Sequence, residues 1–266
     1  MKDDAYRDIN DLYLSMVSPE EVLARDIYDP VMSDWIVNSL PDRASILDAG
    51  CGMGFHMIAL HRGLPARQTG KQYRVFGADY SESMLKSARA NGARAGIPAD
   101  AYRQSAFADL KHIAPWSASF DCVLINYAIY SYPDSVADYD AYFGECLTGV
   151  SHVLRPGGHL LFNLRDWASV VAGPKDHDYV NTHDGVTYHC RYSWKFSEDR
   201  RHTAHVTMRN SASDLKKETI LRFAERTPDE LLALMKTHGY ELVSLQSHGA
   251  GMLKFDTVIA KRSGSV

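Results

Sequence analysis

The feature that most constrains this chain is the stretch ILDAGCGMGFH at residues 46–56. A hydrophobic strand here runs into an acidic residue, Asp48, and then into three glycines spaced two apart, Gly50, Gly52 and Gly54. Glycine permits positive φ and lets the backbone approach a ligand closely, and the start of the following helix offers free N–H groups. We therefore expect a strand–turn–helix unit whose turn lies against a small charged molecule.

The composition fits one sizeable folded unit and argues against two classes of partner. The chain has 266 residues, of which 45% are hydrophobic, enough for one large core. Its net charge of -4 disfavours sequence-independent binding to nucleic acid, which needs clustered basic residues. No apolar run approaches the length of a membrane span, and the acidic start MKDDAYRDIN is unlike a secretory signal. We expect a soluble cytoplasmic protein that binds neither nucleic acid nor membrane.

Cysteines and histidines do not indicate a metal site. The four cysteines are Cys51, Cys122, Cys146 and Cys190. They lie far apart without a CxxC pair, so we expect reduced, buried thiols. His177, His183 and His189 are near one another, but their spacing matches no helical ligand pair. Scattered surface or hydrogen-bonded histidines are the expectation, with no bound metal.

Strand and helix patterns alternate along the first two thirds of the chain. Residues 1–40 are predicted to be helical, and Pro41 ends that stretch. The strands that follow are predicted at 44–50, 73–80, 101–107, 120–130 and 159–166, and the helices at 54–64, 81–96 and 138–154. This alternation predicts an α/β fold with a parallel, doubly wound sheet and right-handed crossovers.

The pattern changes after Trp167. In TYHCRYSWKF, residues 187–196, one face carries aromatic side chains and the other His189, Arg191 and Lys195, the period of a half-buried antiparallel strand. Segments 202–210 and 216–225 are predicted to pair with it as a three-stranded lid over the substrate site. A helix with a Thr227 cap and two closing strands complete the core. The predicted organisation is therefore an N-terminal helical lid segment at 1–40, a cofactor-binding core at 41–174, an antiparallel lid at 175–225, and the last helix and closing strands of the core at 226–262.

The order of acid and glycines separates two ligand classes. A dinucleotide fingerprint reads GxGxxG after its strand, whereas this turn reads DxGxGxG. Asp48 precedes the glycines, where it would repel a pyrophosphate. It would not repel a ligand with a positively charged amino acid portion.

ILDAGCGMG resembles the first motif of class I S-adenosylmethionine-dependent methyltransferases. The resemblance continues in order through VFGADYSESML, FDCVLINYAIYSYPD and VLRPGGHLLFN, over roughly residues 44–165. It implies a Rossmann-like, seven-stranded sheet, S-adenosylmethionine as the cofactor and a small-molecule methyl acceptor.

The resemblance places several cofactor contacts. Asp79 ends the second strand, where a carboxylate accepts hydrogen bonds from both ribose hydroxyls, while Ser81 is the better candidate to cap the next helix. Tyr80 and Met84 are predicted to flank the adenine, although Met84 equally suits the core. Asn126 ends the fourth strand, where its carbonyl is expected to meet the methionine ammonium group.

The contact to the adenine amino group is a departure from the family. Many relatives carry an acidic residue at the position of Ala106. We expect the backbone near Ala106 and Phe107, or the side chain of Asp109, to make this contact instead.

Arg165, in LLFNLRDW at the end of the fifth strand, is the best indication of the acceptor. A guanidinium there suits capture of a carboxylate, and the alternative is an ion pair with Asp166 or Asp176. The N-terminal segment, the LRDW stretch and the lid resemble glycine and sarcosine N-methyltransferases and amino-sugar N-methyltransferases. In the glycine group an arginine at the place of Arg165 holds the substrate carboxylate.

Tyrosines are abundant in the segments expected around the site mouth, where a hydroxyl can orient an amine or accept its proton. These tyrosines are Tyr6, Tyr13, Tyr28, Tyr127, Tyr130, Tyr132, Tyr188 and Tyr192. Tyr13, Tyr127 and Tyr188 are the first candidates for contact with the acceptor. His189 or His202 would suit a general base if the acceptor were a hydroxyl.

Three functions stay open from the sequence. The first is an N-methyltransferase for a small amine or amino acid bearing a carboxylate, and the second an O- or C-methyltransferase of a larger natural-product intermediate. The third is a catalytically silent cofactor-binding partner subunit, which the intact acidic and glycine positions disfavour. A homo-oligomer also stays open.

Overall fold

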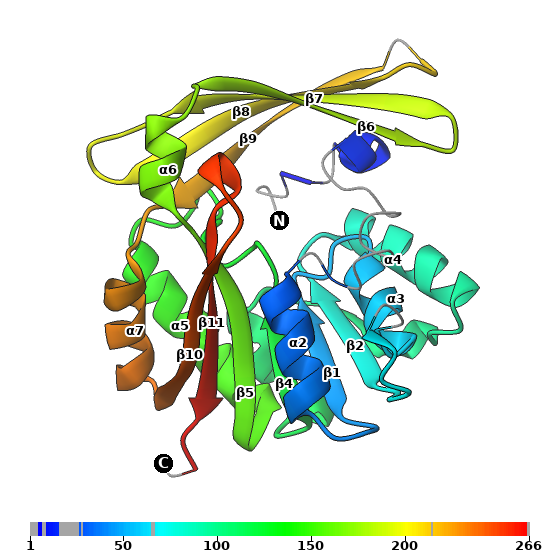
Figure 1. The fold of residues 1–266 in the computed structure, drawn as a ribbon, viewed down its shortest axis with the longest axis vertical. Helices are drawn as coiled ribbons and strands as arrows, with labels where there is room; N and C mark the ends of the chain where they lie inside the picture. The colour runs from blue at the N-terminus through cyan, green and yellow to red at the C-terminus, as the bar shows by residue number, and fades with distance from the viewer. Residues whose placement is uncertain are drawn as a thin grey trace.

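The computed structural model describes residues 5–6, 9–15, 27, 29–64, 67–213 and 215–264. Two β-sheets build the molecule, and the smaller one lies across the upper edge of the larger (Figure 1). The larger sheet has seven strands in the order β10-β11-β5-β4-β1-β2-β3. Its strands are β1 (Ser45–Ala49), β2 (Arg74–Asp79), β3 (Tyr102–Gln104), β4 (Phe120–Ile125), β5 (Leu154–Arg165), β10 (Tyr240–His248) and β11 (Phe255–Arg262). The prediction of a Rossmann-like seven-stranded sheet is confirmed.

One strand of the larger sheet is antiparallel to its neighbours. Strands β3, β2, β1, β4 and β5 are parallel neighbours, whereas β11 is antiparallel to both β5 and β10. The connection at residues 249–254 is too short for a crossover, so β10 and β11 form a hairpin. The parallel arrangement predicted for the strands up to residue 166 is confirmed, and this hairpin sets the direction of the two closing strands, which the sequence pattern had left open.

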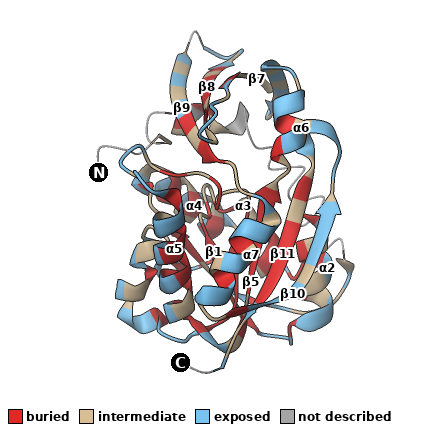
Figure 2. Cartoon of the chain, turned by 90° about the vertical axis from the view of Figure 1, so that its left-hand side faces the viewer, coloured by how far each residue is buried: buried red, intermediate tan, exposed pale blue. Residues whose placement is uncertain are grey.

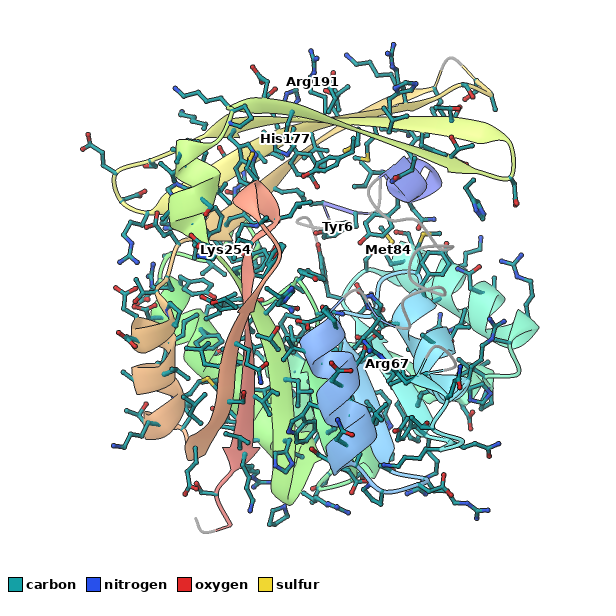
Figure 3. All side chains as sticks on the ribbon, in the orientation of Figure 1. Tyr6, Arg67, Met84, His177, Arg191 and Lys254 are labelled. Atoms are coloured by element: carbon teal, nitrogen blue, oxygen red, sulfur yellow. The ribbon has the colours of Figure 1, made fainter. Side chains whose placement is uncertain are left out.

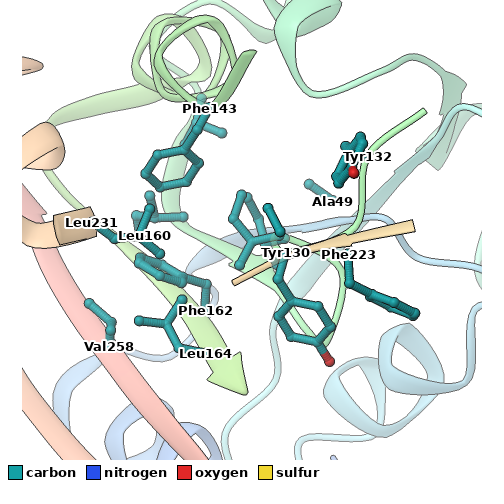
Figure 4. Packing of buried hydrophobic residues seen from close by; sticks show 14 of the residues in the cluster. Ala49, Tyr130, Tyr132, Phe143, Leu160, Phe162, Leu164, Phe223, Leu231 and Val258 are labelled. Atoms are coloured by element: carbon teal, nitrogen blue, oxygen red, sulfur yellow. The ribbon is translucent and has the colours of Figure 1, made fainter. Parts of the chain in front are cut away.

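Helices cover both faces of the larger sheet because side chains alternate along its strands. On β1, Ile46 and Leu47 belong to different hydrophobic clusters, one on each face. One face is covered by α2 (Pro30–Ser39), α3 (Phe55–His61) and α4 (Glu82–Arg94), and the other by α5 (Tyr139–Val153) and α7 (Pro228–Thr237). Figure 4 shows Phe143 of α5 and Leu231 of α7 beside Phe162 of β5, in the hydrophobic cluster on the face that α5 and α7 cover.

The remaining helices are short. They are η1 (Asn10–Ser15), η3 (Ala99–Ala101), η4 (Ala108–His112), η5 (Ala114–Trp116), α6 (Trp167–Ala172) and η6 (Gly251–Leu253). The predicted caps are confirmed at two helices: Ser81 accepts from Met84 N–H at the start of α4, and Thr227 forms a capping box with Glu230 at α7. No helix of the described residues is long and apolar enough to cross a membrane.

The smaller sheet is built by the segment that was predicted as a lid, and we keep that name for it. Its strands are β6 (Asp176–His183), β7 (Val186–Lys195), β8 (Arg201–Asn210) and β9 (Lys216–Ala224), all antiparallel. The predicted alternation is confirmed on β7, where Cys190 and Trp194 are buried against the core and Arg191 and Lys195 are exposed. Figure 3 shows Arg191 above this sheet and His177 of β6 beneath it.

The expectation of three lid strands was wrong, because β6 adds a fourth. Its sequence, DHDYVNTH, is rich in residues that are uncommon in strands. Its alternation appears only as burial, with the odd-numbered positions partly covered and the even-numbered ones exposed. Exposed and buried strips also alternate on the other lid strands, while β11 and β5 of the larger sheet are largely buried (Figure 2).

The described part of the N-terminal segment lies between the lid and the core (Figure 1). Thr219 of β9 donates to the Ala5 carbonyl at 3.0 Å, and Asn10 of η1 donates to the Ser87 hydroxyl of α4 at 3.1 Å. Helix α2 confirms part of the helical prediction, and residues 16–26 lie outside the described residues. The segment therefore contacts both layers at the edge where the site is expected.

Candidate active site

The carboxyl ends of β1, β2, β4 and β5 meet at the edge of the larger sheet that faces the lid (Figure 1). Parallel strands end at a common edge, and open α/β sheets bind ligands there. Four residues singled out from the sequence stand at these ends: Gly50 after β1, Asp79 in β2, Asn126 after β4 and Arg165 in β5. The fold thus brings four distant segments together.

The glycine-rich turn between β1 and α3 requires glycine at each of its three positions. The φ angles are +78° at Gly50, +52° at Gly52 and +80° at Gly54. A β-carbon on Gly50 would come within 3.3 Å of the Phe107 ring and of the Ala128 side chain. The group nearest to a β-carbon on Gly52 would be the Tyr13 hydroxyl, at 3.8 Å. The turn is packed against the core on one side and lies under Tyr13 on the other.

Asp79 forms hydrogen bonds with both the glycine-rich turn after β1 and the turn after β2. Its Oδ2 accepts from Gly52 N–H at 2.8 Å, and its Oδ1 accepts from Ser81 N–H at 2.9 Å. The carboxylate is 7% exposed, so these bonds are shielded from water. The ribose contact stays a prediction, and the structure adds a second contribution from the same side chain, which is to fix the shape of the turn.

Two buried oxygen-bearing groups near the turn have no hydrogen-bond partner among the described residues: both carboxylate oxygens of Asp48 and Oδ1 of Asn126. Burial, and after it the charge of Asp79, raises the pKa of Asp48 to about 7. A buried polar group without a partner is costly, so its presence indicates a ligand that completes the site. These acceptors suit the positively charged amino acid portion expected of the cofactor.

The adenine side is defined by less specific contacts. Met84 is 1% exposed in the first turn of α4, which matches its alternative reading as a buried packing residue. The Ala106 carbonyl accepts from Asp109 N–H at 3.1 Å, and the Phe107 carbonyl accepts from Leu110 N–H at 3.3 Å. The backbone that we expected to meet adenine is therefore folded into the 3-10 turn η4, and its adenine contact stays a prediction.

Three tyrosine rings lie close together beside the glycine-rich turn. The ring of Tyr6 lies edge-on to Tyr13 at 5.9 Å and to Tyr80 at 6.3 Å. Figure 3 shows Tyr6 in the space between the lid and the core. The N-terminal segment thus places aromatic rings above the predicted cofactor position. Tyr28, another candidate from the sequence, lies outside the described residues.

A buried polar network positions the backbone that follows β4. Tyr127 has φ +56°, which is uncommon for a residue other than glycine, and its N–H donates to Asn163 Oδ1 at 3.0 Å. Asn163 Nδ2 donates to Asp29, which also accepts from the Thr257 hydroxyl and, at 3.1 Å, from His248. The network connects the start of α2 to the site and supports a strained backbone beside it.

Arg165 lies in a box of aromatic rings. Its Cζ is 5.0 Å from the centre of the Phe255 ring, 5.5 Å from Tyr130 and 5.9 Å from Trp194. One Nη donates to the Met252 carbonyl at 3.4 Å, and Nε is buried without a hydrogen-bond partner among the described residues. The cation is thus held by a carbonyl, by the Tyr130 hydroxyl and by ring contacts, while its Nε has no hydrogen-bond partner in the described part of the chain.

The described residues show no ion pair between Arg165 and either of the two acids suggested as its partner. Asp166 instead pairs with Lys254 at 2.6 Å and caps α6. Asp176 stands in register with Ser193, on the outer face of the lid. Neither predicted partner neutralises the guanidinium.

Three further candidates lie on lid strands β7 and β8. Tyr188 lies on the inner face of β7, and no described contact joins it to Arg165 or to the glycine turn. His189 is on the opposite, outer face. His202 accepts from Ser197 N–H at Nδ1, 3.1 Å, and its Nε2 bonds Glu225 at 2.7 Å. Both ring nitrogens of His202 are engaged in these bonds, and its role as a general base stays a prediction.

The described cysteines and histidines form neither a disulfide nor a cluster of metal ligands. All four cysteines are buried and none forms a disulfide, as expected for structural thiols. No group of three or more His, Cys, Asp or Glu side chains suited to a metal ion occurs among the described residues.

Sequence reasoning did not identify Phe255, His177, Asp29 or Asn163 as parts of the site. Two of them had a usable signal. Asp29 precedes Pro30, the arrangement of an N-cap followed by proline at the first helical position. Asn163 is a polar residue in the apolar run HLLFNLRD, and buried polar residues are informative. Phe255 had no signal, because its contact with Arg165 comes from strand pairing.

Comparison with known sequences supports the motif reading. Residues 40–205 match the family model described as a methyltransferase domain. Carboxy-S-adenosyl-L-methionine synthase of Campylobacter hominis is 34% identical over 95 residues, 35% of this chain and 35% of that protein. A putative methyltransferase of Bacillus subtilis is 28% identical over 170 residues, 61% of this chain and 62% of that protein. The matches cover less than two thirds of either relative's length.

Solved structures show the same fold. An S-adenosylmethionine-dependent methyltransferase of Clostridium acetobutylicum superposes with a TM-score of 0.71 at 14% identity, covering 98% of this chain and 100% of that one. An amino pentose methyltransferase of Micromonospora echinaspora gives 0.62 at 20% identity, covering 93% and 92%. The chain belongs to the methyltransferase domain family and has the fold of S-adenosylmethionine-dependent methyltransferases.

Proposed function

We propose that the chain transfers a methyl group from S-adenosylmethionine to the nitrogen of a small amine or amino acid that carries a carboxylate. The methyltransferase class and the methyl donor follow from the family and the fold. The proposal adds the acceptor. The observation that carries it is Arg165, a cation at the carboxyl edge of the sheet without an anionic partner among the described residues.

The residues near the glycine turn are suited to hold the cofactor. When bound, S-adenosylmethionine would supply a methyl group on a positively charged sulfur: the lone pair of a neutral amine would bond to the methyl carbon as the carbon–sulfur bond breaks, S-adenosylhomocysteine would leave, and the methylated nitrogen would lose its proton to solvent. Asp48 and Asn126 offer acceptor atoms that suit its ammonium group, and Asp79 offers a carboxylate to the ribose. Tyr80 and the backbone at Phe107 are assigned to the adenine side.

The chain's main contribution to the reaction is to position the acceptor. An aligned nucleophile gains much of its rate from proximity and orientation, so no covalent catalytic group is needed. Arg165 can grip both oxygens of a carboxylate through its planar fork. The rings of Phe255, Tyr130 and Trp194 hold that fork in place and exclude water from it.

Tyrosines near the edge would orient the amine. Burial raises the pKa of Tyr130, and the nearby Arg165 guanidinium opposes the shift only in part, so the hydroxyl stays neutral. A neutral hydroxyl can accept a hydrogen bond from the amine without placing a full charge beside it. Tyr13 and Tyr127 are the other candidates, because they lie at Gly52 and at the end of β4.

A second candidate is O- or C-methylation of a larger, flat acceptor. It is favoured by the inner face of the lid, where His177 stacks on Tyr192 at 5.2 Å and Trp194 stacks on Phe196 at 5.9 Å. An extended aromatic surface suits a planar substrate as well as a small one.

The test is methyl transfer from S-adenosylmethionine, followed by mass spectrometry, to small amines with and without a carboxylate. Arg165→Met removes the charge and keeps a long side chain. We expect the KM for carboxylate-bearing acceptors to rise about 100-fold, as for loss of a charge-assisted pair, with the KM for the cofactor unchanged.

The matched control is Arg191→Met, which removes an exposed arginine from the outer face of the lid. It should leave both KM values unchanged. Turnover only of acceptors without a carboxylate would refute the proposal and favour the second candidate. Cofactor binding without turnover of any acceptor would favour the silent partner subunit.

A further inference from the structure

Neighbouring side chains from three different strands each bury a polar atom without a partner among the described residues. These atoms are Nε of Arg165 on β5, Nδ1 of His177 on β6 and the indole Nε1 of Trp194 on β7. Buried donors are almost always hydrogen bonded, so a group of unsatisfied ones calls for an explanation. An indole N–H and a guanidinium Nε–H can only donate, so whatever satisfies them must be an acceptor.

Ring contacts show how the side chains of Arg165, His177 and Trp194 lie relative to one another. Arg165 Cζ lies 5.9 Å from the centre of the Trp194 ring. The His177 and Trp194 rings are nearly parallel, with centres 6.3 Å apart and an interplanar angle of 21°, and His177 also stacks on Tyr192 at 5.2 Å. Trp194 is 6% exposed, so its N–H has no access to bulk water. Figure 3 shows His177 beneath the lid, on the side facing the core.

Charge and protonation also suit an anion. Burial and the nearby Arg165 guanidinium lower the pKa of His177, which keeps the ring neutral at neutral pH. A neutral imidazole in the Nδ1–H form donates from the atom that is orphaned here. Packing alone would account for the stacked rings, but it would not account for burying their polar atoms unsatisfied.

We propose that the lid forms part of the acceptor's carboxylate site: Trp194 Nε1–H and His177 Nδ1–H donate to the same carboxylate that Arg165 binds. This inference rests on the proposed function and deepens it. The carboxylate is gripped between β5 of the core and β6 and β7 of the lid, so binding of the acceptor fixes the lid over the sheet edge. Specificity for acids over their uncharged analogues then depends on the lid as well as on Arg165.

The test uses the full chain loaded with S-adenosylhomocysteine, so that binding is measured without turnover. Glycine, sarcosine and anthranilate are each titrated beside the corresponding carboxamide by calorimetry. Trp194→Phe and His177→Phe keep a ring and remove the donor, and Arg165→Met serves as the reference. His189→Phe, on the outer face of β7, is the matched control.

We expect at least one acid to bind the unaltered protein more tightly than its carboxamide. Trp194→Phe and His177→Phe should each reduce that preference about tenfold, as for loss of a hydrogen bond to a charged group. The affinity for the carboxamides and the binding of S-adenosylhomocysteine should not change, and His189→Phe should behave like the unaltered protein.

Failure of this inference is distinguishable from failure of the proposed function. If Arg165→Met abolishes the preference while Trp194→Phe and His177→Phe retain it, the lid contributes no donor and only this inference falls. If the unaltered protein prefers no acid, both fall. A second measurement avoids variants that misfold: addition of the preferred acid should shift the Trp194 indole N–H signal in an NMR spectrum. An unshifted signal would overturn the inference.

Discussion

The two halves of the site are built in different ways. In the cofactor half, the glycine turn, Asp79 and Ser81 are joined by backbone N–H groups that donate to one carboxylate, and all three belong to adjacent β–α units. In the acceptor half, Arg165, Trp194 and Phe255 come from the core, the lid and the closing hairpin, and the guanidinium meets the other two side chains through their rings. Backbone turns that are local in sequence form the first half, and side chains from distant strands form the second.

This difference shows why the cofactor could be inferred with more detail than the acceptor. A turn that depends on positive φ and close packing tolerates few residues other than glycine, so its sequence is recognisable. An aromatic box can be assembled from many sequences, because any large ring on a suitable strand can contribute to it. The acceptor half is therefore free to vary while the cofactor half is not.

The largest expected effect concerns Asp48, whose buried carboxyl has no partner in the described cofactor half. Its pKa is raised from 3.8 to about 7, by burial first and then by Asp79. A carboxyl with a higher pKa in the folded chain takes up a proton on folding, so its contribution to stability falls as the pH rises from about 4 to about 7. Asp48→Asn should therefore stabilise the cofactor-free protein more at pH 8 than at pH 5.

The difference in stabilisation should be on the order of 3 kcal/mol, measured by urea denaturation at the two pH values. The same variant should bind S-adenosylmethionine more weakly, because the acceptor charge is gone. Asp100→Asn, at an exposed site on η3, should show neither effect. Equal stabilisation by Asp48→Asn at pH 5 and pH 8 would mean that the carboxyl is already ionised in the folded protein at pH 5.

Asp79→Ala tests whether the cofactor half acts as a unit. It removes the predicted ribose contact and also releases Gly52 N–H and Ser81 N–H. We expect S-adenosylmethionine binding to weaken by about 2–3 kcal/mol in calorimetry. Glu82→Ala, which removes the next, exposed acid, is the control and should leave the affinity unchanged. An unaltered affinity in Asp79→Ala would refute the ribose assignment.

The smallest effect is expected where the lid is attached to the core. Arg201, at the start of β8, donates from Nε to the Tyr132 hydroxyl and from one Nη to the Ala137 carbonyl, both at 3.0 Å. Arg201→Met should loosen the lid, weakening acceptor binding by about 1 kcal/mol and leaving cofactor binding unchanged. Arg209→Met, on the exposed outer face of β8, is the control. Equal losses for cofactor and acceptor would contradict the separation of the two halves.

Local patterns predicted the core well because each depends on near neighbours. The alternation of strands and helices, the caps at Ser81 and Thr227 and the glycine turn each depend on residues within one turn or strand. The polar strand β6 was missed, and the direction of β11 was left open. Pairing with a neighbouring strand stabilises β6, and a short connection reverses β11, so neither depends on its own residues alone.

The sequence by itself determined the Rossmann-like core, the methyltransferase family and an arginine at the end of β5. Only the tertiary structure decided what surrounds that arginine. It paired Asp166 with Lys254, placed Phe255, Tyr130 and Trp194 around the guanidinium, and stacked the His177 ring on Trp194. A turn's conformation is set by residues adjacent in the chain, whereas the charge balance of a buried cation is set by whichever strands the fold packs against it.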